Sequence, residues 1–492
     1  MLRGRLQALD AEQMDRLHAG ALRILEQTGL QIQGQFLLRA LAEAGCKVDF
    51  AAHRAWFRPE LVERQVAAQR GRCTLVRSSL WYPFCRELPE DRPAVPEQFT
   101  VDYGYTTPWI FDLPERRYRK PTVQDQIEAI KLGNALDCVA AINSPYICGD
   151  FDPRTETIES ARVLLLHTKK PGWVGTSSGR EVKYLAEMAA MVTGGDAERL
   201  RNEPPLFTSA YCTTSPLKLD TRSCDVLEAA LEYGFPINFC PMPILGATTP
   251  MTPAGSVVVA AAEILGCMTA ATLLAPQAHY FSTSIAAEMD MRTTQVCYAT
   301  PAAILTDVAL HELFRVKYGL VHNVEPGYVE AKTPGIQATM MKLYRQMAFG
   351  STVSLPLAIG ALDNAAVFSP AQAMLDLEMG EALHRFHSGM EVSDETMCLD
   401  LIAEMEFGTR RTYLDTDHTL RHFRQIGWQP RLMDRRYCDH TAVAVLGDEK
   451  LLLNADQAWR KLVAAQPEAE PNPALSAELD RIVAAARNEL LA

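Results

Sequence analysis

Seven short runs of apolar and small residues recur along the chain, and each is followed by a stretch with helical spacing. An apolar run of strand length that leads through a turn into a helix is half of a parallel βαβ unit. Seven such units predict an α/β fold, a (β/α)8 TIM barrel, although the pattern does not locate the eighth strand. The predicted strands are residues 139–144, 173–178, 206–212, 237–240, 279–285, 320–325 and 353–360.

A Gly-, Thr- and Pro-rich turn from Pro241 to Gly255 follows the predicted strand at 237–240, and an Ala-rich helix extends from Ala254 to Leu274. In a barrel of this kind, ligands bind at the carboxyl ends of the strands. The side chains expected at those ends are therefore the candidates for function: Cys240, Met242, Thr283, His322, Glu325, Asp363 and Asn364.

The composition argues against a polyanion as the main ligand. The net charge is −12, from 48 basic and 60 acidic side chains, which disfavours nucleic acid and anionic membranes. Twelve scattered cysteines without a C-x-x-C pair suit a reducing compartment, and no secretory signal opens the chain, so we expect a cytoplasmic protein. The apolar run from Gly255 to Pro276 contains Glu263, and it is predicted to be a buried barrel helix rather than a membrane span.

We expect three regions along the 492 residues. Residues 1–100 carry amphipathic helical patterns and form an N-terminal helical region. Residues 101–390 form the barrel, and residues 391–492 form a C-terminal helical extension. Seven arginines between Arg410 and Arg436 are a candidate docking patch for an acidic partner, with a solvated surface as the alternative.

Three catalytic motifs occur only in weak form. His418 and His422 have the spacing of two ligands on one helix face, but neighbouring arginines oppose a cation, so no metal site is predicted. The segment Gly175–Gly179 matches G-x-S-x-G, yet no histidine or acid is an evident partner for its serine. Backbone N–H groups of residues 246–255 could hold an anion, but two prolines there remove donors.

The predicted barrel mouth combines aromatic rings with a carboxylate. Tyr103, Tyr105 and Trp109 are placed to line one rim, where an aromatic face attracts a desolvated cation by about 2 kcal/mol; alternatively, they fill the gap below the N-terminal region. His322 lies three residues before Glu325, on the opposite face of a regular strand, so we expect the Pro-Gly pair that follows to bend the chain. Such a site suits a small organic cation.

Several segments of the chain form a recognisable set: Gly246–Ser256, Ala331–Ala338, Gly360–Asp363, Ser369–Glu378, Asp417–Arg424 and Pro430–Arg435. In content, order and spacing they resemble the trimethylamine methyltransferase superfamily. The similarity covers nearly the whole chain.

The resemblance implies a TIM barrel that transfers a substrate methyl group to the cobalt of a separate corrinoid protein. Archaeal trimethylamine enzymes of the family carry pyrrolysine in the segment that corresponds to Glu325–Glu330, where this chain has only standard residues. The chain therefore resembles the non-pyrrolysine branch, whose members demethylate quaternary amines such as glycine betaine, proline betaine, carnitine and γ-butyrobetaine. A quaternary amine leaves as a neutral tertiary amine, so its demethylation needs alignment more than general acid catalysis.

On this hypothesis, we expect a cognate corrinoid protein as partner, corrinoid as cofactor and a homo-oligomeric enzyme. A tertiary amine or sulfonium substrate remains an alternative, as does a non-catalytic amine-binding scaffold for a corrinoid partner. The expected catalytic residues are Glu325 and His322, the expected substrate-binding residues are Tyr103, Tyr105, Trp109, Phe239, Tyr328 and Arg292, and the expected cofactor-binding residues are Gly246, Thr248 and Thr249.

Overall fold

The computed structural model describes residues 6–71, 101–139, 141–170, 172–196, 205–206, 208, 210–352, 357–405, 412–435 and 447–492. Parts of three predicted strands, at 139–144, 206–212 and 353–360, lie outside the described residues, as do Arg410, Arg411 and Arg436 of the arginine patch.

Four parallel strands follow one another in the middle of the molecule. Their order is β14-β11-β9-β7, so neighbours in the sheet are also successive along the chain. The register pairs Ser282 with His322 on one side and with Phe239 on the other. These strands confirm four of the predicted βα units, and their bounds are β7 Ala210–Tyr211, β9 Ile237–Phe239, β11 Tyr280–Ser284 and β14 His322–Val324.

A fifth and a sixth strand identify the unit that the hydrophobic pattern did not locate. Strand β4 (Val101–Asp102) pairs in parallel with β15 (Leu357–Ala358), and Val101 also forms a parallel bridge with Val139. Hydrogen bonds continue from there, because the amide of Ser144 donates to the carbonyl of Trp173. The segment that begins at Val101 therefore supplies a further parallel βα unit, next to the predicted strand at 139–144.

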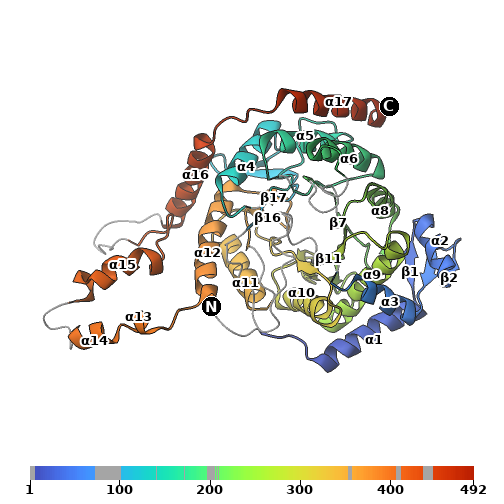
Figure 1. Cartoon of the computed structure of the whole chain (residues 1–492), viewed down its shortest axis with the longest axis horizontal. Coiled ribbons are helices and arrows are strands. Elements are labelled where there is room, and N and C mark those ends of the chain that lie inside the picture. The colour runs from blue at the N-terminus through green and yellow to red at the C-terminus, as the bar shows by residue number, and fades with distance from the viewer. Residues whose placement is uncertain are drawn as a thin grey trace.

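Helices surround these strands in a ring (Figure 1). The chain alternates between strand and helix because each helix packs an apolar face onto the strands. The bounds are α4 Val123–Ala135, α5 Glu156–His167, α6 Gly179–Thr193, α8 Thr221–Tyr233, α9 Pro253–Leu274, α10 Pro301–Glu312, continued by the π-helix η3 Leu313–Lys317, α11 Ile336–Thr352 and α12 Pro370–Ser388.

Helix α9 is the segment whose length and hydropathy would allow a membrane span, and 78% of its most apolar window is buried inside the protein. Its charged residue, Glu263, is also buried. The Glu263 carboxylate accepts hydrogen bonds from the hydroxyls of Thr213 and Ser215, at 2.5 and 2.9 Å, and from the amide of Leu217, at 2.8 Å. The helix is therefore an interior helix of the fold, as the sequence predicted.

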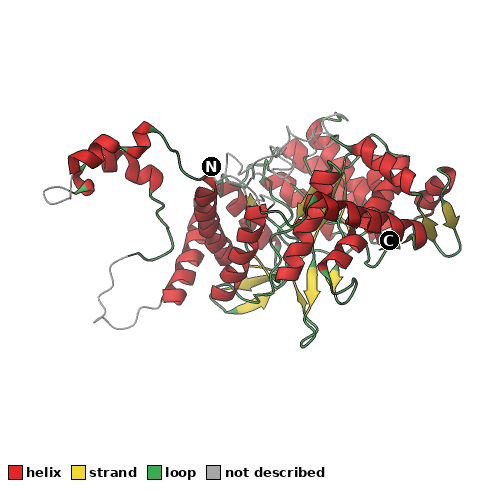
Figure 2. Cartoon of the chain, turned by 90° about the horizontal axis from the view of Figure 1, so that it is seen from below, coloured by secondary structure: helices red, strands yellow, loops and turns green. Residues whose placement is uncertain are grey.

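Short strands form additional sheets in the loops that leave the carboxyl ends of the central strands. Figure 2 shows strands emerging together at the lower edge of the helical ring. They lengthen these loops on one face, which is the face where barrel enzymes bind ligands. Their bounds are β5 Trp109–Asp112, β6 Arg117–Arg119, β10 Ile244–Leu245, β12 Ala287–Met289, β13 Val296–Cys297, β16 Ala361–Leu362 and β17 Val367–Phe368.

The N-terminal region is not purely helical, which corrects the sequence prediction. Helix α1 begins where Asp10 and Gln13 form a capping box. Three short strands pair with one another, and β1 also pairs in parallel with β8 of the ring. The bounds are α1 Ala11–Gln27, β1 Leu30–Ile32, α2 Gln35–Glu43, β2 Lys47–Asp49, β3 Arg54–Trp56, α3 Pro59–Gln69 and β8 Lys218–Leu219.

The C-terminal region first leaves the ring and then returns to it. Helix α16 packs on α12 and α4, and α17 packs on α5 and α6. Between α12 and α16, several short helices project away from the rest of the molecule (Figures 1 and 2). Their bounds are α13 Asp394–Met397, α14 Leu399–Met405, η4 Tyr413–Asp415 and α15 Asp417–Ile426; those of the returning helices are α16 Gly447–Ala465 and α17 Pro473–Leu490.

Candidate active site

Side chains on β11 alternate between the helix layer and the interior of the ring. Tyr280 donates to two carbonyls of the α9 segment, at 2.9 Å each, and Ser284 donates to a carboxylate of α10, at 2.6 Å. Tyr280 and Ser284 are an even number of residues apart and share the helix-facing side, so Thr283, one residue before Ser284, faces inward. Its hydroxyl donates to Oδ1 of Asn238 on β9, at 3.1 Å. The interior is thus lined by polar side chains at this level.

His322 belongs to the outward-facing set, although the sequence suggested a catalytic role. Its Nδ1 lies 2.8 Å from Oγ of Ser282 and its Nε2 lies 3.1 Å from Oγ of Ser284. The ring stacks on Phe314 with the centroids 5.1 Å apart. Burial lowers the pKa of His322 to about 3, so the imidazole is neutral at ordinary pH. The structure places this ring in the helix layer and does not bring it together with Glu325.

Glu325 follows β14 on the inward face and begins a turn against which aromatic rings pack. A Cβ built on Gly327 would lie 3.0 Å from the ring of Tyr105, so this ring lies against the turn. Within the turn, Tyr328 packs on Tyr298, with ring centroids 5.0 Å apart. Burial, followed by the nearby negative charge of Glu325, raises the pKa of Tyr328 well above its usual range. Tyr105, Tyr328 and Glu325, three residues expected from the sequence, therefore lie in one cluster.

Sulfur groups complete this cluster. Cys240 is buried with Tyr298, and Cys212, Met242 and Tyr328 pack against the same group. The hydrogen bond to Cys212 and then burial hold the pKa of Cys240 well above its usual range, so this thiol carries no charge, and the same bond lowers the pKa of Cys212. The surface beside Glu325 is therefore aromatic and weakly polar.

A buried arginine of α11 holds the turn from behind. Arg345 donates to the carbonyl of Tyr298, to that of Glu325 at 2.7 Å, and to that of Pro326 at 3.4 Å. One guanidinium thereby joins two segments of chain that meet only in the folded protein. Arg345 is a positioning residue for the carboxylate and the aromatic rings, and it was not expected from the sequence.

Asp307 of α10 lies behind the neighbouring loop. Its carboxylate accepts from the hydroxyl of Ser284, at 2.6 Å, and from the amide of Ala286, at 3.0 Å. Burial raises the pKa of Asp307 to about 6, although the charge of Arg345 opposes that shift. The Asp307 carboxylate therefore holds the loop at Ser284 and Ala286 in place from the helix layer.

Two predicted aromatic residues lie away from the cluster. Tyr103 is fully buried and donates from its hydroxyl to the carbonyl of Ala129 in α4, at 2.7 Å, so its ring fills the layer between β4 and α4. Phe239 lies on β9 between two inward-facing residues and is buried in the helix-facing core. The structure does not bring either ring to the inner face.

Trp109 and Arg292 lie on the loops at the rim. The Trp109 ring is partly exposed and already holds a cation, because Nζ of Lys120 lies 3.9 Å from its centroid. The Arg292 side chain is 91% exposed, and its nearest carboxylate is that of Asp290, at 3.7 Å. Both residues therefore lie outside the cluster around Glu325.

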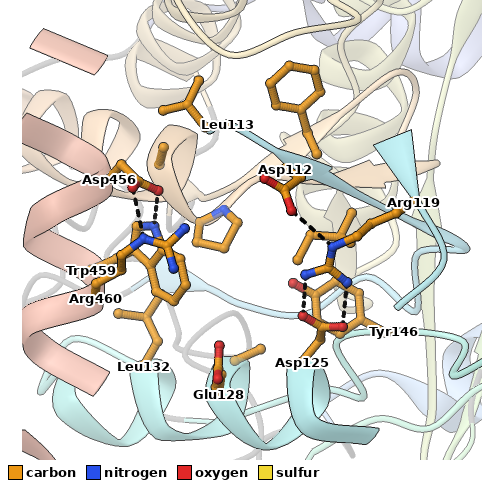
Figure 3. A pocket seen from close by; sticks show the side chains of 15 residues that line it. Asp112, Leu113, Arg119, Asp125, Glu128, Leu132, Tyr146, Asp456, Trp459 and Arg460 are labelled. Atoms are coloured by element: carbon orange, nitrogen blue, oxygen red, sulfur yellow. Dashed lines mark hydrogen bonds and ion pairs between the residues drawn. The ribbon is translucent and has the colours of Figure 1, made fainter. Parts of the chain in front are cut away.

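A separate cavity of about 100 Å³ lies outside the ring, between the β5–β6 hairpin, α4 and α16 (Figure 3). Arg119 binds both oxygens of Asp125 at 2.6 Å and also binds Asp112 at 3.2 Å. Asp456 accepts from Trp459 and from Arg460, at 2.8 Å each. Both arginines of the cavity wall are therefore paired with carboxylates, and we interpret the cavity as part of the contact between the hairpin and α16.

The sequence profile of trimethylamine methyltransferase matches residues 3–490 of the chain. The chain belongs to the trimethylamine methyltransferase family. The resemblance inferred from separate motifs is thereby confirmed, and the protein is a methyltransferase.

Relatives of this methyltransferase include two proteins of Desulfitobacterium hafniense. Trimethylamine methyltransferase MttB of strain DCB-2 is 29% identical over 426 residues, which cover 86% of this chain and 83% of that protein. Glycine betaine methyltransferase of strain Y51 is 24% identical over 485 residues, which cover 97% of this chain and 96% of that protein. The crystal structure of the hydroxylamine MtmB complex aligns with a TM-score of 0.48 and 13% identity over 93% of this chain and 88% of that chain.

In the methyltransferase, the expected corrinoid-binding residues form the turn that leads from β10 into α9. The hydroxyl of Thr248 accepts from the amide of Ile244, at 2.9 Å, and the Thr249 hydroxyl bonds to that of Ser256, at 2.9 Å. Gly246 has a φ of +84°, and a Cβ there would lie 2.6 Å from Cε of Met291. The hydroxyls therefore close the turn, and methionine covers its outer side.

The methyltransferase cluster contains three residues that sequence reasoning missed. Tyr298 precedes α10 in an irregular loop, and Cys212 lies in a predicted strand without a distinctive motif. Arg345 could have been noticed in the sequence, because Arg345 and Lys342 place two charges on the apolar side of a helix, the side that is buried in the structure. A charge in that position indicates a specific partner inside the protein.

Proposed function

We propose that this methyltransferase moves a methyl group from a small quaternary amine to the Co(I) of a cognate corrinoid protein. The expected substrate class is that of glycine betaine, proline betaine, carnitine and γ-butyrobetaine. The observation that carries the proposal is the Glu325 turn, which lies against the ring of Tyr105 and contains Tyr328. A carboxylate beside aromatic faces attracts a permanently charged ammonium group.

The proposal includes a closed eight-stranded TIM barrel as the catalytic domain, over residues 101–390. Parallel pairing of β7, β9, β11 and β14, together with the pairing of β15, β4 and Val139, supports this closure. Residues 1–100 and 391–492 would then be extensions that cover its outside. A cytoplasmic location is part of the same proposal, because the reaction requires a strongly reduced cobalt.

The residues of the chain bind and orient the donor in this mechanism. Glu325 and the rings of Tyr105 and Tyr328 hold the ammonium group, and Arg345 keeps the turn in place through its carbonyl contacts. The departing tertiary amine is neutral, so alignment of the methyl group matters more than proton donation. The neutral state of His322 agrees with a site that does not need a general acid.

The rim of the candidate site fits a corrinoid that is carried by another protein. Met251 and Met291 are exposed beside Gly246, so the rim presents apolar thioether groups at this turn. The corrinoid, when bound, supplies a cobalt nucleophile that accepts the methyl group. Residues of this chain would contact its outer surface through the turn at 246–249.

A tertiary amine is the second candidate substrate. The relative that is 29% identical over 86% of this chain is a trimethylamine methyltransferase. A protonated tertiary amine would meet the same carboxylate and rings, and it must keep its proton on nitrogen during methyl transfer so that a neutral secondary amine leaves.

Methyl transfer to cob(I)alamin from a panel of quaternary, tertiary and sulfonium donors tests the proposal through the absorbance of methylcobalamin. We expect a quaternary donor to react fastest. Tyr105→Ala should raise its KM roughly tenfold. Trp109→Ala is the matched control, because Lys120 already covers that ring. Binding of the amines without any absorbance change would leave only the non-catalytic scaffold.

A further inference from the structure

Two cysteines stand at the ends of neighbouring strands of the central sheet. Cys212 directly follows β7 and Cys240 directly follows β9, and the parallel register of these strands pairs Tyr211 with Phe239. Cys212 and Cys240 are the next pair in this register. Because the side chain of Asn238 faces the interior of the ring, alternation along the chain places both sulfur atoms on the same interior wall.

The two thiols are in direct contact. A hydrogen bond joins the side chains of Cys212 and Cys240, and both residues belong to the cluster that contains Tyr298 and Tyr328. Cys240 is only 4% exposed, whereas Cys212 is partly exposed. Adjacent strands lie roughly 4.8 Å apart, which is within the range of about 4.4–6.8 Å between Cα atoms that a disulfide bridges. The pair can therefore be joined covalently within the folded protein.

The pair combines one reactive thiol with one protected thiol. The hydrogen bond from Cys240 lowers the pKa of Cys212 against the opposing effect of burial, and the positive charge of Arg222 assists. Arg222 is in the first turn of α8, which lies beside Cys212, because the hydroxyl of Ser223 donates to the Cys212 carbonyl at 2.9 Å. A thiol of low pKa next to a second, resolving thiol is typical of cysteines that are oxidised reversibly.

We propose that Cys212 and Cys240 form a reversible disulfide in the wall of the candidate site when the protein meets a hydroperoxide, and that this bond weakens cation binding beside Glu325. The Cys212 thiolate attacks hydrogen peroxide and becomes a sulfenic acid, while the second oxygen leaves as hydroxide. The Cys240 sulfur then displaces the sulfenic oxygen, which leaves as water with the thiol proton. The two sulfur atoms lose two electrons, and the peroxide oxygens gain them.

The disulfide would alter the site because both sulfur atoms border it. Glu325 is close enough to Cys240 for its negative charge to contribute to the raised pKa of that thiol. The ring of Tyr328 packs in the same cluster. A disulfide holds two sulfur atoms closer together than separate thiols can lie, so it draws the ends of β7 and β9 together and disturbs the packing of this wall.

The effect on the donor rests on the proposed function, whereas formation of the bond does not. Reduced cobalt is consumed by the same oxidants that would join the two cysteines. The disulfide would therefore release the methyl donor under conditions in which no methyl acceptor is available.

Peptide mapping of the full-length chain tests the bond directly. The protein is treated with a small excess of hydrogen peroxide, the remaining thiols are alkylated, and chymotrypsin, which cleaves after Phe239, separates Cys240 from Cys224. We expect mass spectrometry to find the Cys212–Cys240 linkage, and dithiothreitol to remove it. Cys212→Ser and, independently, Cys240→Ser should abolish the linkage. Cys297→Ser is the matched control, because Cys297 is also a partly buried free thiol, and it should keep the linkage.

Binding of tetramethylammonium measures the consequence without cobalt or a strong reductant. Saturation-transfer NMR gives the Kd of each protein before and after peroxide treatment, once the peroxide has been removed. We expect oxidation to raise the Kd roughly tenfold in wild type and in Cys297→Ser, and dithiothreitol to restore it. In Cys212→Ser the ratio of the two Kd values should stay close to one, whatever its starting affinity.

Two results would overturn the proposal. The first is peroxide-treated wild type in which Cys212 and Cys240 are recovered unlinked. The second is a linked protein that binds tetramethylammonium as tightly as the reduced protein does. If neither form binds tetramethylammonium, the proposed cation site is overturned together with the effect on binding, while the linkage in the peptide map still supports the disulfide itself.

Discussion

Glu325 lies where a carboxylate has most effect on a bound cation, beside aromatic rings and partly shielded from water. The Glu325→Gln variant keeps the shape of the side chain and removes its charge. We expect the KM for a quaternary donor to rise 10- to 100-fold, which corresponds to roughly 1.4–2.8 kcal/mol of lost binding. Steady-state methylation of cob(I)alamin measures this effect, with Glu288→Gln on β12 as the control. Equal KM values for the two variants would remove Glu325 from the cation site.

Asp307 gives the fold a specific pH dependence. Burial raises its folded-state pKa from 3.8 to about 6, so the folded protein binds this proton more tightly than the unfolded chain. The associated stability is fully present below pH 4 and is lost as the pH rises through 6. The shift corresponds to a cost on the order of 3 kcal/mol for the ionised form above pH 7.

Asp307→Asn preserves the acceptor for Ser284 and Ala286 and removes the titration. The stability of this variant relative to wild type should therefore increase between pH 5 and pH 7.5. Urea unfolding at several pH values measures this difference. A difference that stays constant across the range would show that Asp307 titrates normally.

At the scale of elements, α11 and α12 are joined by a buried ion pair. Nζ of Lys342 lies 2.5 Å from Oδ2 of Asp376, and both side chains are almost completely buried. The same Asp376 oxygen accepts from the amide of Gly360, at 2.8 Å, so the pair also fixes the end of the β15 segment. Removing one partner leaves a buried charge, which typically costs about 3–5 kcal/mol.

We therefore expect Asp376→Leu to lower the urea midpoint strongly and Lys342→Met/Asp376→Leu to regain most of the loss. Glu478→Gln is the control, because its ion pair with Arg481 is exposed and contributes less than about 1 kcal/mol. A double variant as unstable as the single one would mean that the hydrogen bond to Gly360 matters more than the charge.

The repeated βα pattern predicted the ring because each central strand is an apolar run with a helix directly after it. The unit that begins at Val101 was not located from the sequence, because β4 is two residues long and is followed by Tyr103 and a glycine instead of an apolar run. Its neighbour β15 lies more than 250 residues away in sequence, and such long-range pairing leaves no local signal. The short strands of the N-terminal region were missed because α1 to α3 dominate the local periodicity.

The sequence predicted the candidate site only where the alternation of side chains along a strand determines which residues face the interior. Side chains alternate between the two faces of a strand. Glu325 is at a position that faces the interior of the ring and His322 is at one that faces the helix layer, so this alternation alone predicts that they lie on opposite sides. Tyr298 and Arg345 are brought to Glu325 by elements that are 27 and 20 residues away in sequence. Such contacts depend on how helices pack around the strands, which a single sequence does not specify.

At the scale of the whole molecule, the proposed reaction brings donor and corrinoid to the same face, because the lengthened loops and the Glu325 cluster share it. Met291 is 63% exposed in the β12–β13 loop and covers Gly246. Met291→Glu inserts a negative charge into the apolar part of the rim beside Gly246 without touching Glu325. We expect the KM for a corrinoid protein to rise roughly tenfold, because an unpaired charge would be buried on docking. The KM for the methyl donor should stay unchanged.

Initial rates at varied corrinoid protein and fixed donor measure this effect, and Phe50→Glu is the control on a distant surface. Free cob(I)alamin provides the internal comparison. It lacks the protein that docks on the rim, so its methylation should be less sensitive to Met291→Glu than that of the protein-bound corrinoid. If both acceptors are unaffected while donor KM rises, the loop at 290–295 contacts substrate, and the corrinoid protein docks elsewhere on this face.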